Sequence, residues 1–164
     1  MLPQDIEAIA EAVIRRAEAK GLMIATAESC TGGLVSGALT AIAGSSAVLD
    51  RGFVTYSNEA KVEMLGVDSD LLASFGAVSE PTARAMAEGA TARSRASISV
   101  SVTGIAGPGG GSPQKPVGLV HFAAHGPNGR TVHLEKRFGD IGRDAIRLES
   151  VRTALGLLTD AVSE

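Results

Sequence analysis

The chain has 164 residues, carries a formal net charge of −3 at neutral pH, and is 45% hydrophobic with no tryptophan. This length predicts a single domain over residues 1–164 with a sizeable buried core. The slightly acidic balance argues against a general nucleic-acid binder, but it is compatible with a local basic pocket for a small anion.

The sequence predicts a soluble, cytoplasmic protein. Its opening stretch, MLPQDIEAIAEAV, is charged and amphipathic and does not resemble a signal peptide. No apolar run approaches the ~20 residues that span a bilayer. Cys30 is the only cysteine, so an intramolecular disulfide and a cluster of metal-bound thiolates are both excluded.

Hydrophobic periodicity and turn residues divide the chain into alternating helices and strands. A first helix ends at Gly21, Ser57 is placed to cap a short helix that ends at Gly66, and Ser79 is placed to cap a longer one. The expected helices include residues 6–17, 34–42, 58–65, 68–76, 80–94 and a last one from about 142; the expected strands are 22–28, 52–56, 96–106, 117–125 and 130–138.

The strand at 96–106 alternates between apolar residues and serines, which predicts one face of small residues against a tightly packed helix. The last two strands are close enough to form a hairpin. Residues 107–116, GPGGGSPQKP, cannot be regular structure and are expected to form a loop. Alternating helices and strands followed by a hairpin predict an α/β fold, a three-layer α/β/α sandwich with a mixed sheet.

The stretch AESCTGG places Ser29 and Cys30 at a strand-to-helix turn, where either side chain is a candidate nucleophile. Unpaired N–H groups at a helix N-terminus stabilise a developing oxyanion, and Gly32 and Gly33 let a substrate approach the backbone. The alternatives are that Ser29 is only a helix cap and that Cys30 is a small buried hydrophobe.

Three further segments carry candidate chemistry. Lys61 could serve as a general base if burial lowers its pKa, although most lysines are solvated. The glycine-rich stretch from Thr103 to Pro116 could bind an anion through its N–H groups, or be only a surface loop. Arg143 and Arg147 lie one helical turn apart and could clamp a phosphate, or pair with surface acids. The three histidines show no third ligand at metal spacing, so no metal site is expected.

The order of these motifs resembles the CinA carboxy-terminal domain family, the bacterial nicotinamide mononucleotide (NMN) amidohydrolases, from about residue 5 to 160. The matching stretches are TAESCTGG, GSSAVLDRGFVTYSNEAKVEMLGV, GAVSEPTARAMAEGA and SVTGIAGPGGGSPQKPVGLV. The resemblance implies hydrolysis of the NMN carboxamide to nicotinate mononucleotide and ammonia, by serine and lysine and without a cofactor or metal. Many relatives also carry a large amino-terminal domain resembling molybdopterin-binding proteins, whose activity is not expected here.

Carried over position by position, the resemblance assigns catalysis to Ser29 as nucleophile, Lys61 as base and Tyr56 as an assisting group. It assigns substrate binding to the following residues: Cys30, Thr31, Gly32, Gly33, Thr103, Gly104 and Arg143. In the segment FGDIGRDAIR, two more residues separate the aspartate from the arginine than in the family's usual GDR, so Arg147 stays open as the phosphate ligand.

Two other functions stay open at this stage. The chain could hydrolyse another small amide by the same serine chemistry, or bind a nucleotide without catalysis in DNA uptake or damage response. Alanine-rich helix faces also suggest a homo-oligomer.

Overall fold

The computed structural model describes all 164 residues and contains six α-helices, one 3₁₀-helix and five strands. The helices are α1 (Gln4–Lys20), α2 (Leu34–Thr40), α3 (Asn58–Leu65), α4 (Ser69–Phe75), α5 (Glu80–Ala92) and α6 (Arg143–Val162), with the 3₁₀-helix at Ser45–Ala47. The strands are β1 (Ile24–Glu28), β2 (Leu49–Val54), β3 (Ile98–Gly104), β4 (Leu119–His125) and β5 (Thr131–Arg137).

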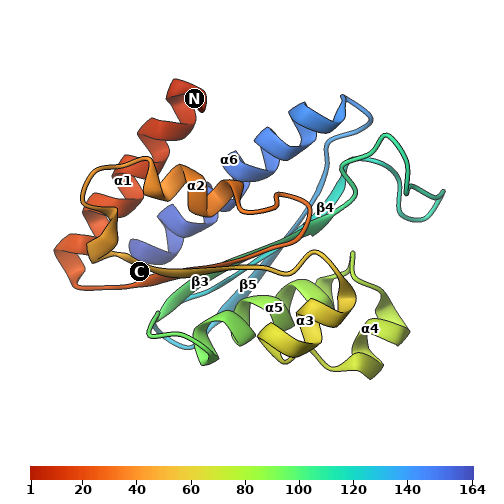
Figure 1. The fold of residues 1–164 in the computed structure, drawn as a ribbon, viewed down its shortest axis with the longest axis horizontal. Coiled ribbons are helices and arrows are strands. Elements are labelled where there is room, and N and C mark those ends of the chain that lie inside the picture. Colours follow the sequence, from red (N-terminus) through yellow and green to blue (C-terminus); the bar gives the residue numbers. More distant parts are fainter.

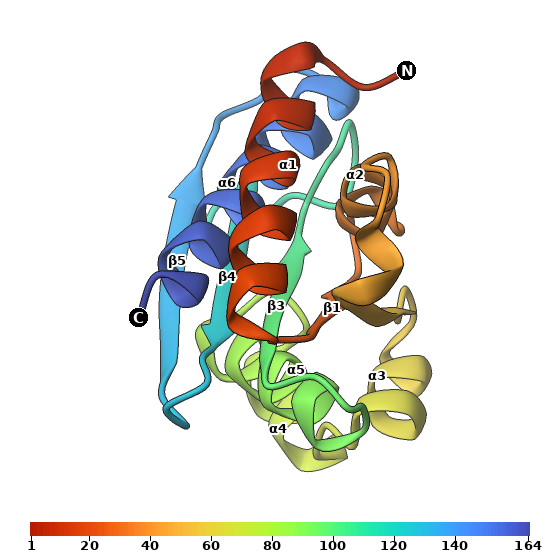
Figure 2. The ribbon, with the colours of Figure 1, turned by 90° about the vertical axis from the view of Figure 1, so that its left-hand side faces the viewer.

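The five strands form one mixed sheet between two layers of helices. The strand order is β2-β1-β3-β4-β5, in which β1 pairs in parallel with β2 and β3, and the β4–β5 hairpin is antiparallel. Helices α1, α2 and α6 cover one face, and α3, α4 and α5 cover the other (Figures 1 and 2). This arrangement confirms the predicted α/β/α sandwich.

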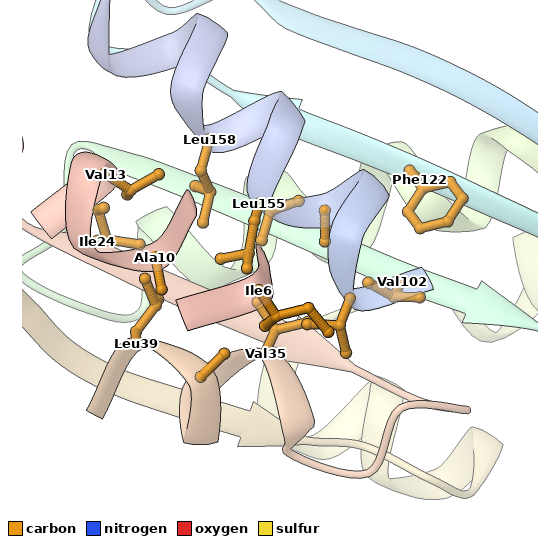
Figure 3. Packing of buried hydrophobic residues seen from close by; sticks show 14 of the residues in the cluster. Ile6, Ala10, Val13, Ile24, Val35, Leu39, Val102, Phe122, Leu155 and Leu158 are labelled. Atoms are coloured by element: carbon orange, nitrogen blue, oxygen red, sulfur yellow. The ribbon is translucent and has the colours of Figure 1, made fainter. Parts of the chain in front are cut away.

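The larger core lies between the sheet and the layer formed by α1, α2 and α6, where 24 buried residues pack together. Figure 3 shows Ile6 and Ala10 of α1 meeting Leu155 of α6 and Val35 of α2 over the sheet. A smaller cluster of nine buried residues fills the opposite side, around Met86 of α5. None of these helices combines the length and the apolar character that crossing a membrane requires.

The alternation along β3 has the predicted consequence. Its apolar side chains, such as Val100, enter the larger core. On the other face, Ser99 and Ser101 are fully buried and donate hydrogen bonds of 2.6 Å to the α5 carbonyls of Ala87 and Ala83. Because these side chains are short, α5 packs directly over the end of β3 that carries the site described below.

The predicted boundaries of β2 are wrong by a few residues. The strand was expected at 52–56 but spans Leu49–Val54, and its first partner is Ile24 of β1. Because β2 is an edge strand with mostly exposed or half-buried residues, its opening Leu-Asp-Arg has no hydrophobic alternation to mark it. Pairing with β1 sets the boundary instead.

Two helical glycines should respond oppositely to substitution. Alanine normally stabilises a helix by ~0.5–1 kcal/mol relative to glycine. A Cβ at Gly156 of α6 has no neighbour within 4 Å, so Gly156→Ala should raise the free energy of unfolding by about that amount. A Cβ at Gly89 of α5 would overlap the Leu65 carbonyl, so Gly89→Ala should lower the free energy of unfolding by ~1–3 kcal/mol. Denaturant titration measures both; stabilisation by Gly89→Ala would contradict the close α3–α5 packing.

Candidate active site

A cavity of about 250 Å³ opens at the carboxyl ends of the parallel strands β1 and β3. After β1 the chain continues to β2 on one side of β1, and it later returns to form β3 on the other side. The strand order therefore reverses at β1, and open α/β sheets bind ligands at such a switch point. The lining residues are Ser29, Cys30, Tyr56, Asn58, Lys61, Ala77, Val78, Thr103, Gly104, Ala106 and Arg143. The lining thus contains a serine, a cysteine and two basic residues, but no acid.

Ser29 and Lys61, 32 positions apart in sequence, meet in this cavity. The Lys61 Nζ lies 3.2 Å from Ser29 Oγ and donates to the carbonyl oxygens of Thr55 at 2.9 Å and Tyr56 at 3.5 Å. A neutral amine has two N–H groups and one lone pair. When both N–H groups are directed at these carbonyls, the lone pair is left to accept a hydrogen bond from the serine hydroxyl. The arrangement therefore suits removal of the Ser29 proton.

The environment of Lys61 favours this neutral form. Its side chain is 1% exposed, and it makes no salt bridge with any Asp or Glu. Burial disfavours the ammonium ion and lowers the pKa of Lys61 from its ordinary value, while the nearby Cys30 opposes this to a smaller extent. Helix α3 holds the residue in place, because Ser57 caps it by accepting from the Ala60 N–H and Gly66 ends it in the left-handed conformation.

The turn that carries Ser29 is tied to the start of α2 by an acidic residue. Glu28 is fully buried, and its carboxylate accepts from Val35 N at 2.9 Å and Ser36 N at 3.0 Å. The Cys30 and Thr31 N–H groups, in the turn itself, donate to no backbone carbonyl. Donors for an oxyanion are therefore in the turn rather than on the helix.

Cys30 lines the cavity but is a poor nucleophile. It is 6% exposed, and burial raises the pKa of its thiol to about 11, so the thiolate is scarce at neutral pH. The other predicted residues of this turn, Thr31, Gly32 and Gly33, do not line the cavity. Both glycines have positive φ, 58° and 103°, and allow the chain to turn from the strand into α2.

The end of β3 forms the opposite wall. The Thr103 hydroxyl donates to the carbonyl of Ala77 at 2.9 Å, which fixes the segment before α5 against the cavity. A Cβ on Gly104 would lie 2.7 Å from Val120 Cγ2, so glycine permits the close approach of β4. The glycines further along the predicted anion loop do not reach the site: Gly109–Gly111 border a separate hollow with Arg137.

The two candidate arginines have different positions. Arg143 lines the cavity and donates to the Gly107 carbonyl at 2.6 Å and to the Tyr56 hydroxyl at 3.3 Å. Arg147 lies behind the Ser29 turn and donates to the carbonyls of Cys30 at 3.1 Å and Thr31 at 3.4 Å. Tyr56 is 63% exposed, and its phenol contacts Arg143 while its carbonyl faces Lys61.

Sequence reasoning missed several residues of this region. Glu28 had one usable signal, an acidic residue at the end of an otherwise apolar buried strand. Thr55, whose carbonyl binds Lys61, had none, because any residue supplies a carbonyl. The histidines His121 and His133 contact each other at 2.9 Å on the hairpin, away from the cavity. No three His, Cys, Asp or Glu side chains gather in an arrangement that could hold a metal ion.

The fold and the site define an α/β protein with a serine beside a buried lysine at the switch point of its sheet. The model of the CinA C-terminal domain family matches residues 6–162, and the chain belongs to that family. The structure resembles that of the competence/damage inducible protein CihA from Agrobacterium tumefaciens, at 60% identity and a TM-score of 0.97, covering 100% of this chain and 99% of that one. It also resembles the competence damage-inducible protein A of Klebsiella pneumoniae, at 36% identity and a TM-score of 0.91, covering 97% of this chain and 98% of that one.

Two kinds of curated relative match this chain. The nicotinamide-nucleotide amidohydrolase PncC of Escherichia coli K12 is 48% identical over 159 residues, which are 96% of this chain and 95% of that protein. A CinA-like protein of Anaeromyxobacter sp. strain K is 52% identical over 148 residues, which are 90% of this chain but 36% of that protein. The chain thus spans about a third of the length of the CinA-like relatives that it matches.

Burial of Lys61 should be visible as a pH-dependent stability difference. Because the lysine pKa is lower in the folded protein than its unfolded value of ~10.4, the unfolded chain binds more protons between those two values. Stability relative to Lys61→Met, which cannot titrate, should therefore rise as the pH increases from neutral towards ~10. Denaturant titrations of both proteins at several pH values measure this difference. A difference independent of pH would contradict the lowered pKa.

Proposed function

We propose that this protein hydrolyses the carboxamide of NMN, giving nicotinate mononucleotide and ammonia. The observation that carries the proposal is the 3.2 Å contact between Ser29 Oγ and the buried Lys61 Nζ inside the cavity. The near full-length match to a protein named nicotinamide-nucleotide amidohydrolase supplies the substrate. The expected cytoplasmic location and homo-oligomer are parts of this proposal that still await tests.

The first half of the reaction acylates Ser29. Neutral Lys61 takes the hydroxyl proton as Ser29 Oγ bonds to the carboxamide carbon, and the carbonyl oxygen becomes an oxyanion. The Cys30 N–H, next to the nucleophile and bound to no backbone carbonyl, is the first donor for that charge. As the C–N bond breaks, the Lys61 ammonium returns its proton to the leaving nitrogen, which departs as ammonia.

The second half releases the product through the same groups. Lys61, neutral again, takes a proton from a water molecule whose oxygen attacks the acyl carbon. The second tetrahedral intermediate collapses with cleavage of the ester bond, and Lys61 protonates the departing Ser29 oxygen. Because Lys61 must begin each half as a neutral amine, the active fraction of the enzyme increases as the pH rises through its lowered pKa.

The charge of the cavity suits a phosphorylated substrate. Arg143 is the one permanently charged residue of the lining, and no carboxylate competes for it. Arg143 lies beside the exposed Tyr56, where a phosphate could bind without entering the buried part that holds Lys61. We assign Arg143 to the phosphate, and Tyr56 to the substrate entrance rather than to proton transfer.

Two alternative functions are distinguished from NMN hydrolysis by experiment. A serine amidohydrolase for another small amide would use the same Ser29–Lys61 pair. A non-catalytic nucleotide-binding protein would use only the cavity and its arginine, as the competence and damage-inducible names of the similar structures suggest for those proteins. Ammonia release from a panel of amides that includes NMN separates the three.

The nucleophile is tested by two neighbouring substitutions. Ser29→Ala should reduce ammonia release from NMN by at least ~10³-fold without unfolding the protein, because the acylated oxygen is lost. Cys30→Ala is the matched control: it removes the buried thiol one residue away and should keep most of the activity. Coupled ammonia assays and thermal melts measure both. Full activity of Ser29→Ala with loss in Cys30→Ala would reverse the assignment.

The phosphate site is tested by comparing two substrates. Arg143→Ala should raise KM for NMN by ~10- to 100-fold, because a charge-assisted hydrogen bond contributes roughly 1.5–3 kcal/mol. The same variant should change much less with nicotinamide riboside, which has no phosphate. Steady-state kinetics with both substrates provide the comparison. Equal losses would assign Arg143 to the chemistry or the fold instead.

A further inference from the structure

The Ser29 turn is held from two sides by charged residues that do not line the cavity. Glu28, from β1, binds the start of α2, and Arg147, from α6, binds the turn itself. Neither faces the position expected for a substrate. Both contact backbone groups within a few residues of the nucleophile, so their role concerns the shape of the turn.

Hydrogen bonds occupy the acceptors of this turn and leave donors free. The Ser29 carbonyl accepts from Gly32 N at 3.0 Å, and the Thr31 carbonyl accepts from Leu34 N at 3.0 Å. The Cys30 carbonyl has one partner in the protein, the Arg147 Nε at 3.1 Å. The N–H groups of Cys30 and Thr31 donate to no backbone carbonyl. A turn with satisfied carbonyls and spare N–H groups presents a positive surface to an anion.

The contact with Arg147 sets the orientation of one peptide group. A trans peptide is planar, so its C=O and N–H point in opposite directions. When Arg147 fixes the Cys30 carbonyl towards α6, the plane of the Cys30–Thr31 peptide is fixed, and the backbone of Cys30, which lines the cavity, is held in one conformation. Without the guanidinium, this carbonyl has no protein partner, and the peptide loses the contact that fixes its orientation.

Glu28 fixes the other end of the same segment. Its carboxylate binds two consecutive N–H groups at the start of α2, and the Ser29 N–H donates to the Val102 carbonyl at 2.9 Å. The strand, the turn and the helix are thereby tied together immediately before and after the nucleophile. The segment left between these anchors is the one that Arg147 holds.

We propose that Arg147 is a positioning residue that fixes the Cys30–Thr31 peptide, and with it the backbone of Cys30, so that the Cys30 N–H donates to the oxyanion formed when Ser29 attacks. This inference rests on the proposed amidohydrolase function. It separates two arginines one helical turn apart on α6: Arg143 binds substrate in the ground state, and Arg147 acts on the transition state through the backbone. Loss of Arg147 therefore lowers kcat, whereas loss of Arg143 raises KM.

The test compares three variants of the full chain. Arg147→Ala should lower kcat for NMN by ~10- to 100-fold, as expected when an oxyanion donor is misplaced, with KM changed by less than about threefold. Arg147→Lys keeps the charge and can still donate to one of the two carbonyls, so it should retain more activity than Arg147→Ala. Arg152→Ala is the control on the same helix, because it removes surface ion pairs with Asp5 and Glu149 and should leave kcat unchanged.

Chemical rescue distinguishes positioning from a general loss of structure. Guanidinium chloride at non-denaturing millimolar concentration should restore part of kcat in Arg147→Ala and have no such effect on Arg152→Ala. A loss of kcat that neither guanidinium nor lysine restores, together with a lowered Tm, would show a merely structural role and overturn the inference. An unchanged kcat, or a loss confined to KM, would also overturn it.

The activity of the wild-type chain on NMN distinguishes a failure of this inference from a failure of the proposed function. If the wild type hydrolyses NMN but Arg147→Ala is fully active, the positioning role fails and the function stands. If the wild type releases no ammonia from NMN, the function fails, and acylation of Ser29 by p-nitrophenyl acetate becomes the readout. Slower p-nitrophenol release by Arg147→Ala than by Arg152→Ala would then support positioning, and equal rates would overturn it.

Discussion

The burial of one amine, that of Lys61, is the constraint on which the rest of the site depends. A lysine in water is an ammonium ion and cannot accept a proton. Here its side chain is enclosed between the end of β1, the segment before α3 and the end of β3, with two carbonyls but no carboxylate beside it. A carboxylate partner would stabilise the charged form and abolish the base. The cavity therefore combines carbonyl acceptors with the absence of acids.

The small residues of the chain allow the elements around that amine to approach closely. Ser99 and Ser101 bring α5 onto β3, and Gly89 brings α5 against the end of α3, which carries Lys61. Gly104, at the end of β3, likewise allows β4 to approach closely. Larger side chains at these positions would separate the layers and open the cavity to water, which would raise the pKa of the amine. The packing of the fold and the basicity of Lys61 are thus linked.

Helix α6 connects the core to two distinct parts of the site. Its apolar face fills the larger core with α1, as Figure 3 shows for Leu155 and Leu158. Its first turns present Arg143 to the cavity entrance and Arg147 to the back of the Ser29 turn. A rigid helix anchored in the core keeps both guanidinium groups in fixed positions relative to the nucleophile.

The sequence by itself determined the elements and the fold class, because local signals mark them: Ser57 and Ser79 cap helices, Gly21 and Gly66 end them, and β3 alternates between apolar and small residues. The family motifs also pointed to Ser29, Lys61 and Arg143, which the fold brings to one cavity. Only the tertiary structure decided that Glu28 occupies the start of α2, and that Arg147 binds the turn while Arg143 lines the cavity. These assignments depend on contacts between backbone groups and side chains from distant segments, and backbone carbonyls and N–H groups leave no trace in the pattern of residue types.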